Sequence, residues 1–224
     1  MYTKQESIDF HEEILSFVPL KIKGFGNMSN SLNGVNVSQL VETINAVKRE
    51  PNIADFKFNS VTTWVNGGHC QTKIQSFTSA NIEDKSRDKP FMLNADEPPL
   101  LLGENHGPNA VEALLHALGS CLSVGIVYNA AARNINVKSL SFDIEGTLNL
   151  HSFLGLSETI RPGYSNIQVK MHIDTDASQD KIEELCKYVE KTSPIMDCLR
   201  NPVPVTLSMT SQANSPESEK VLHL

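Results

Sequence analysis

The sequence predicts an α+β fold, and three patterns support this prediction. Apolar residues alternate with polar ones over residues 55–79 and again over 137–150 and 165–173, as in half-buried strands. A long helical pattern separates these two strand regions, and a second helical pattern follows them. Strand pairs linked by hairpin-like turns favour antiparallel sheets over a doubly wound parallel sheet.

The chain divides by composition into three parts. Residues 1–30 form an N-terminal extension with a short, imperfect apolar stripe and a linker containing Gly, Asn and Ser. Residues 31–210 form the folded domain, and residues 211–224 form a polar, flexible C-terminal tail. A chain of 224 residues that is 40% hydrophobic is long enough to bury a core without staples.

The first helix is predicted over residues 36–49, with Asn36 as its N-cap and Pro51 as its stop signal. The strands over 55–79 turn at residues 66–68, where Asn-Gly-Gly is a hairpin signal. Residues 80–108 are rich in Pro and Gly, and we expect a loop there with one short strand near 90–94.

The longest helical pattern covers residues 110–132. Asn109 is its predicted N-cap, and Glu112 occupies the position that completes a capping box. Gly119 and Gly125 lie in its interior, where each costs about 1 kcal/mol relative to Ala. Small residues are tolerated where another element packs closely, so we expect a central, buried helix.

The remaining elements alternate in the same way. Strands are predicted over 137–150 and 165–173, and a third helix begins after Ser178. A break follows at 192–194, and a last short strand covers 203–209.

Charge and sequence signals exclude several classes of protein. The net charge of −7 argues against nucleic-acid binding, which needs a basic face. No apolar run approaches about 18 residues, so we expect no membrane span. The charged first ten residues do not form a secretory signal, and we expect a cytoplasmic protein. No cysteine pair or histidine–acid spacing predicts a metal, and no phosphate loop predicts a nucleotide cofactor.

The four cysteines are the candidates for chemistry. Cys121 lies inside the long helix, where it is either an inert core residue or a nucleophile. A nucleophilic cysteine must be a thiolate, whereas the ordinary pKa of a cysteine thiol is about 8.5. Cys186 lies on an apolar helix face and is expected in the core. Cys70 should point away from His69, because neighbours in a strand face opposite sides. Cys198 is either a second reactive thiol or a packed side chain.

Several motifs together resemble the superfamily of osmotically inducible protein C and the organic hydroperoxide resistance proteins (OsmC/Ohr). The specific part is Gly-Pro-Asn-Ala-Val-Glu-Ala-Leu-Leu-His-Ala-Leu-Gly-Ser-Cys-Leu at 107–122. Further matching runs are 96–99, 132–135 and 199–205, and the runs 33–37 and 64–67 look like a long, divergent subgroup. The resemblance covers roughly residues 31–210.

This resemblance implies two curved antiparallel sheets around two central helices, in an intertwined homodimer with its sites at the subunit interface. It also implies that a cysteine at the position of Cys121 attacks an organic hydroperoxide and becomes a sulfenic acid. A second cysteine then condenses with it, and an external thiol reductant resets the disulfide.

Three positions depart from the family pattern. Ser193 stands where the family has its second cysteine, and the nearest thiol is Cys198, five residues later. His69 stands where the family has Arg after a Gly-Gly pair, and it lacks the fixed fork of Arg. Glu112 lies one position after the place of the family glutamate. On a helix it is about 180° around the axis from Cys121 and about 13.5 Å away, so only a partner subunit can bring a Glu112 side chain to Cys121.

Two functions follow as hypotheses. In the first, Cys121 reduces organic hydroperoxides in the oxidative stress response, with His69 and Glu112 as supporting residues and Cys198 or an external thiol as the resolving group. In the second, the protein has the same fold but no peroxidatic activity, and it binds a small apolar ligand at the dimer interface.

Overall fold

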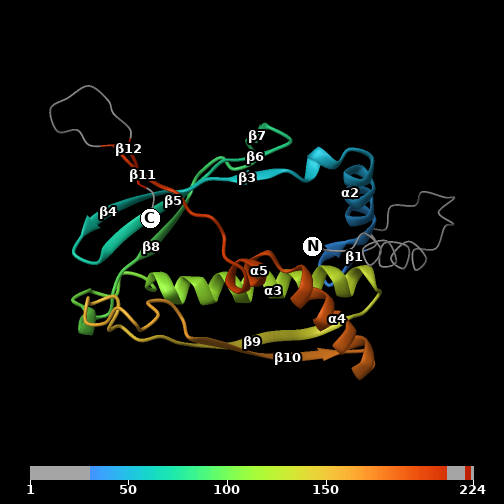
Figure 1. Cartoon of the computed structure of the whole chain (residues 1–224). Helices are drawn as coiled ribbons and strands as arrows, with labels where there is room; N and C mark the ends of the chain where they lie inside the picture. Colours follow the sequence, from blue (N-terminus) through green and yellow to red (C-terminus); the bar gives the residue numbers. More distant parts are fainter. Residues whose placement is uncertain (1–30, 211–219, 223–224) are drawn as a thin grey trace, which may run out of the picture.

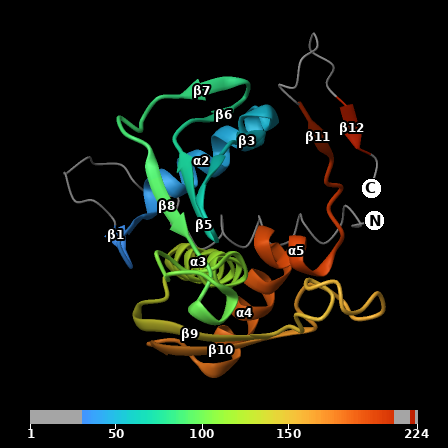
Figure 2. The same ribbon diagram turned by 90° about the vertical axis from the view of Figure 1, so that its left-hand side faces the viewer.

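The computed structural model describes residues 31–210 and 220–222, and it confirms the α+β class. The long helix α3 (Ala110–Ala132) crosses the molecule (Figure 1) and packs against α4 (Gln179–Thr192), α5 (Pro194–Arg200) and β9. Viewed along α3, the β9–β10 ribbon lies on one side of the helix and strands β5 and β8 lie on the other (Figure 2). A shorter helix, α2 (Val37–Arg49), stands near the C-terminal end of α3.

All strand pairs in the described residues are antiparallel. The pairs and triplets are β1 (Ser31–Leu32) with β2 (Val35–Asn36); β3 (Phe56–Phe58), β6 (Phe77–Ser79) and β7 (Ile82–Asp84); β4 (Val61–Asn66), β5 (His69–Ile74) and β8 (Phe91–Ala95); β9 (Val137–Thr147) with β10 (Asn166–Thr175); and β11 (Leu207–Met209) with β12 (Lys220–Leu222). Two 3-10 turns, η1 (Pro51–Ala54) and η2 (Pro99–Leu101), connect elements.

Local signals explain the elements that were predicted. The side chain of Asn36 accepts the backbone N–H of Gln39 and so caps α2, which ends before Pro51. The β4–β5 hairpin turns at Gly67, whose φ of +52° favours glycine. At the start of α3, Asn109 and Glu112 form the predicted capping box.

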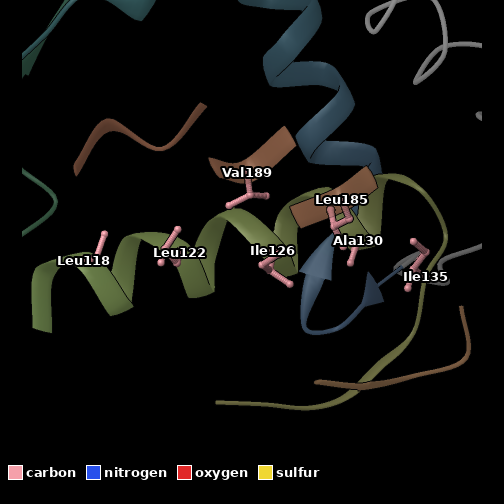
Figure 3. Close-up of a cluster of buried hydrophobic side chains, with 7 residues drawn as sticks. All are labelled: Leu118, Leu122, Ile126, Ala130, Ile135, Leu185 and Val189. Carbon is pink, nitrogen blue, oxygen red and sulfur yellow. The ribbon is translucent and has the colours of Figure 1, made fainter. Parts of the chain in front are cut away.

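The core lies between α3 and α4. Its fully buried hydrophobic cluster is Leu118, Leu122, Ile126, Ala130, Ile135, Leu185 and Val189 (Figure 3). The inward residues of β9 and β10 pack against this cluster from the sheet side. The two glycines of α3 permit close packing, because a Cβ on Gly125 would lie 2.7 Å from Val189 Cγ1 and one on Gly119 would lie 3.0 Å from Ile144 Cδ1.

The prediction of a central, buried helix holds for one face of α3. Leu118 and Ile126 are buried, whereas Val124 and Tyr128 remain about half exposed on another face. By length and composition α3 is apolar enough to span a membrane, a property that the core helices of soluble proteins share. Within the described residues, it serves here as the central packing helix.

The elements that were not predicted from the sequence include β7 in the Pro-rich loop region, α5 after the break at Ser193, and β12, which pairs with β11 although it belongs to the expected tail. The short strands β1 and β2 and the two 3-10 turns were not predicted either. The last strand is also shorter than expected, since only Leu207–Met209 is paired. The predicted extension over residues 1–30 and most of the tail lie outside the described residues.

Candidate functional site

Cys121 lies near the middle of α3, on the side of the helix that meets the junction of α4 and α5. The capping box fixes where the helix begins, and the core residues Leu118 and Leu122 hold one of its faces against the core. Cys121 itself is half-buried. Its sulfur is therefore held by rigid surroundings while the residue keeps contact with solvent.

The hydroxyl of Ser193 is the hydrogen-bond partner of Cys121. Ser193 Oγ lies 3.2 Å from Cys121 Sγ, and Ser193 is only 4% exposed. This oxygen also accepts the backbone N–H of Met196, at 3.3 Å, because Ser193 is the N-cap of α5. The hydroxyl can donate its proton to the sulfur or accept the thiol proton, and it donates when Cys121 is a thiolate, which has no proton to give.

His69 belongs to a second cluster, before the start of α3. Its ring stacks on that of His106, with centroids 4.5 Å apart, and His69 Nε2 lies 3.2 Å from Asn94 Oδ1. His106 Nδ1 lies 2.7 Å from Asp96 Oδ2, and Asp96 is 3% exposed. Glu97 N–H also donates to this carboxylate. We call His69, His106, Asp96 and Asn94 the histidine cluster.

Hydrogen bonding dominates the electrostatics of this cluster. The hydrogen bond from His106 holds the pKa of Asp96 well below its usual range, and burial acts in the opposite direction. Backbone N–H groups of His106, Glu104 and Glu97 lower that pKa further. Asp96 is therefore a charged anchor for the loop that leads into α3.

Glu112 has a structural role within one chain. Its carboxylate accepts the backbone N–H of Asn109, while its own N–H donates to the Asn109 side chain. The uninterrupted α3 confirms that Glu112 and Cys121 are nine helical residues apart, on opposite sides and about 13.5 Å apart along the axis. Nearby, burial and then the charge of Glu112 raise the pKa of Tyr164, whose hydroxyl donates to Val111 O.

The other three cysteines have separate surroundings. Cys198 is exposed on α5, whose core-facing residues are Ile195, Met196 and Leu199. Cys186 packs against the core as predicted, its sulfur is 3.9 Å from that of Met171, and burial together with nearby glutamates raises its pKa. Cys70 lies on β5, opposite Trp64 and Ala95.

The structure therefore joins Cys121 to Ser193 and to none of the other three predicted site residues. In the part of the chain that the structure describes, no hydrogen bond or ion pair links Cys121 with Cys198, His69 or Glu112. Sequence reasoning missed His106 and Asp96 as neighbours of His69. Two turn sequences were the available signal. Asp96 begins the Asp-Glu-Pro-Pro run after a predicted strand, and His106 lies in the Asn-His-Gly run before the predicted long helix.

An open cavity of about 690 Å³ lies between α3, the β9–β10 sheet and the α4–α5 region. Its floor is apolar and includes Leu118, Phe142 and Met171, whereas Arg161 and Arg200 also line it. Arg200 is paired with Glu190 at 2.7 Å. Cys121 does not line this cavity. Across residues 31–210 and 220–222, no group of three His, Cys, Asp or Glu side chains is placed to hold a metal ion.

Comparison with known proteins identifies one family. Residues 103–208 match the family model described as OsmC-like protein. No curated protein sequence matches the chain.

Among solved structures, an OsmC-like protein from Mycoplasma pneumoniae is 18% identical, with a TM-score of 0.49 over 65% of this chain and 89% of that one. An organic hydroperoxide resistance protein OsmC from Legionella pneumophila is also 18% identical, with a TM-score of 0.46 over 65% and 90%. An OsmC-like protein of unknown function from Vibrio cholerae is 12% identical, with a TM-score of 0.49 over 63% and 92%.

Proposed function

From the membership of this chain in the OsmC/Ohr superfamily, through its OsmC-like domain at residues 103–208, we propose that it reduces organic hydroperoxides with the thiol of Cys121. The observation that supports this most is the hydrogen bond between Cys121 Sγ and the buried Ser193 hydroxyl. A thiolate needs such a donor more than a neutral thiol does, because hydrogen bonds to charged groups are the stronger ones. An inert core cysteine needs no polar partner.

The proposed reaction begins with the Cys121 thiolate. Its sulfur attacks the terminal oxygen of the hydroperoxide, so that an S–O bond forms as the O–O bond breaks. The alkoxide leaves, takes up a proton and becomes an alcohol. Cys121 is oxidised by two electrons to the sulfenic acid. A thiol, from Cys198 or from another molecule, then condenses with the sulfenic acid and releases water.

The same proposal includes a homodimer. Trp64, Phe91 and Leu93 lie on one face of the β4–β5–β8 sheet and are 71%, 58% and 53% exposed. An apolar sheet face of this kind is typical of an interface. Within one chain neither His69 nor Glu112 is bonded to Cys121, so in this proposal these residues support the thiol only from a second copy.

Peroxide consumption by the purified full-length chain tests the proposal. With an organic hydroperoxide and a dithiol reductant, the wild type should consume peroxide, and C121S should not. C186S is the matched control, because Cys186 is a partly buried thiol that packs against the core and should be dispensable for turnover. A wild-type protein that leaves several organic hydroperoxides unreacted would contradict the proposal.

The cavity favours a second candidate function, the binding of a small apolar ligand without peroxidase activity. A volume of about 690 Å³ is within the range of ordinary small-molecule sites, and its floor is apolar. This candidate predicts ligand binding that C121S leaves intact and no sulfenic acid at Cys121 after peroxide treatment.

A cytoplasmic location and a role in oxidative stress belong to the first proposal, in keeping with a family of soluble proteins.

A further inference from the structure

We propose that this protein works with a single cysteine: Ser193 is the hydrogen-bond donor to Cys121, and the oxidised Cys121 is reduced by a thiol from another molecule. This inference rests on the proposed function and names the reductant class that it requires. Three features of the structure carry it, namely the hydroxyl beside the sulfur, the surroundings of the other cysteines and the exposure of Cys121.

The first feature is that a hydroxyl occupies the place beside the sulfur where a resolving thiol would act. Ser193 Oγ is 3.2 Å from Cys121 Sγ and Ser193 is 96% buried. Its position is fixed, because it ends α4, caps α5 and accepts the backbone N–H of Met196. A serine hydroxyl donates a hydrogen bond to a thiolate or sulfenate but does not form a disulfide.

The second feature is the orientation of α5. Its core face is formed by Ile195, Met196 and Leu199, and the exposed Cys198 lies about 100° around the helix from the centre of that face. Cys186 is held in the core beside Met171, and Cys70 lies in the β4–β5–β8 sheet. Within the described residues, Cys121 therefore contacts no thiol.

The third feature is access. Cys121 is half-buried, so its residue retains contact with solvent. An incoming low-molecular-weight thiol attacks the sulfenic sulfur, an S–S bond forms, the S–O bond breaks, and water leaves. A second thiol molecule attacks this mixed disulfide, so that Cys121 is released as a thiolate and the reductant leaves as its own disulfide. The two thiols supply the two electrons that Cys121 lost.

The S193C variant tests the geometry directly. The 3.2 Å separation is about one ångström longer than an S–S bond, so an introduced thiol should close a disulfide with Cys121. After one equivalent of organic hydroperoxide, the wild type should carry a dimedone adduct at Cys121 and no intramolecular disulfide by peptide mass spectrometry. S193C should carry the disulfide and lose most of the adduct.

Two further variants keep the inference testable if S193C folds poorly. C198S separates the two sources named for the resolving thiol: if that thiol comes from another molecule, turnover with a monothiol reductant persists in this variant. S193A should slow alkylation of Cys121 by iodoacetamide at pH 7 by about tenfold and move its pH profile upward, since a hydrogen bond to a charged group is lost. S120A is the matched control, because Ser120 is adjacent to Cys121 in sequence but its Oγ contacts His116.

The outcomes separate this inference from the proposed function. A wild-type disulfide between Cys121 and Cys198, or loss of monothiol turnover in C198S, would overturn the single-cysteine cycle while leaving peroxide reduction in place. An unchanged alkylation profile in S193A would overturn the role of Ser193. A Cys121 that neither forms the adduct nor supports peroxide consumption would contradict both.

Discussion

The α3–α4–β9–β10 unit and the β3–β8 strands differ in how much of their apolar surface the chain itself covers. In the described residues, every buried hydrophobic side chain belongs to α3, to the turn after it or to α4. The strands from β3 to β8 contribute none, and their large side chains such as Phe58 and Trp64 are 69% and 71% exposed. The α3–α4–β9–β10 unit buries a core of its own, whereas the β3–β8 strands expose apolar side chains that a second copy would cover in the proposed dimer.

This difference also divides the candidate site residues. Cys121 and Ser193 belong to the unit with the core, where packing fixes their 3.2 Å contact. His69 belongs to the other unit, in the histidine cluster. The reactive thiol is thus positioned by a single chain, whereas any help from His69 depends on assembly.

Truncation in the core should have the largest effect on stability. Leu185 is fully buried between α4 and α3, so Leu185→Ala should lower the free energy of unfolding by about 2–5 kcal/mol. Urea denaturation followed by circular dichroism measures the loss. Phe58→Ala is the comparison in the exposed unit, and an equal loss there would contradict the division into two units.

Filling the contact between α3 and α4 should have a smaller effect. Gly125→Ala places a methyl 2.7 Å from Val189 Cγ1, and overpacking costs about 1–3 kcal/mol against about 1 kcal/mol gained in helix propensity. Gly119→Ala is the matched control, since its methyl would meet only the end of the Ile144 side chain at 3.0 Å. Thermal denaturation should rank Gly125→Ala as the less stable variant, and the reverse ranking would show that α4 does not pack as described.

The Asp96 carboxylate should make stability depend on acid pH. Its folded pKa is lowered, so its contribution is present above the unfolded value near 4 and is lost as the pH falls toward the folded value. Asp96→Asn should remove this part of the pH dependence between about pH 4 and pH 2. Thermal melting across this range measures it, and parallel curves for both proteins would contradict the hydrogen-bonding account.

Polar substitution on the exposed sheet face should have the smallest effect on folding and its main effect on assembly. Leu93→Ser should change the stability of the isolated chain by about 0.5 kcal/mol or less. Sedimentation should nevertheless show a shift from dimer toward the 24.7 kDa monomer. Lys73→Ser is the control on the opposite face of the same sheet. A wild type that sediments as a monomer at all concentrations would contradict the proposed dimer.

Much of the fold could be predicted from the sequence because its signals are local. The capping box at Asn109 and Glu112 lies within four residues, and the bounds of α3 follow from it and the apolar stripe. The β4–β5 hairpin follows similarly from the turn at Gly67. The short β7 and β12 were missed because their pairing partners, and not their own composition, define them.

The candidate site was less predictable because its contacts are long-range. Cys121 and Ser193 are 72 positions apart, and only the packing of α4 against α3 brings them together. A resemblance marked Ser193 as a departure from the family pattern, but it contained no information that the hydroxyl would face the sulfur. The stack of His69 on His106 likewise depends on how the β5–β8 sheet meets the loop before α3.

A count of free thiols after oxidation tests the central claim most directly. The chain has four cysteines, and all four are free in the structure. After one equivalent of organic hydroperoxide and trapping of the sulfenic acid, three titratable thiols should remain per chain, with Cys121 as the one lost. Four remaining thiols would contradict peroxide reduction by Cys121, and two would contradict the single-cysteine cycle.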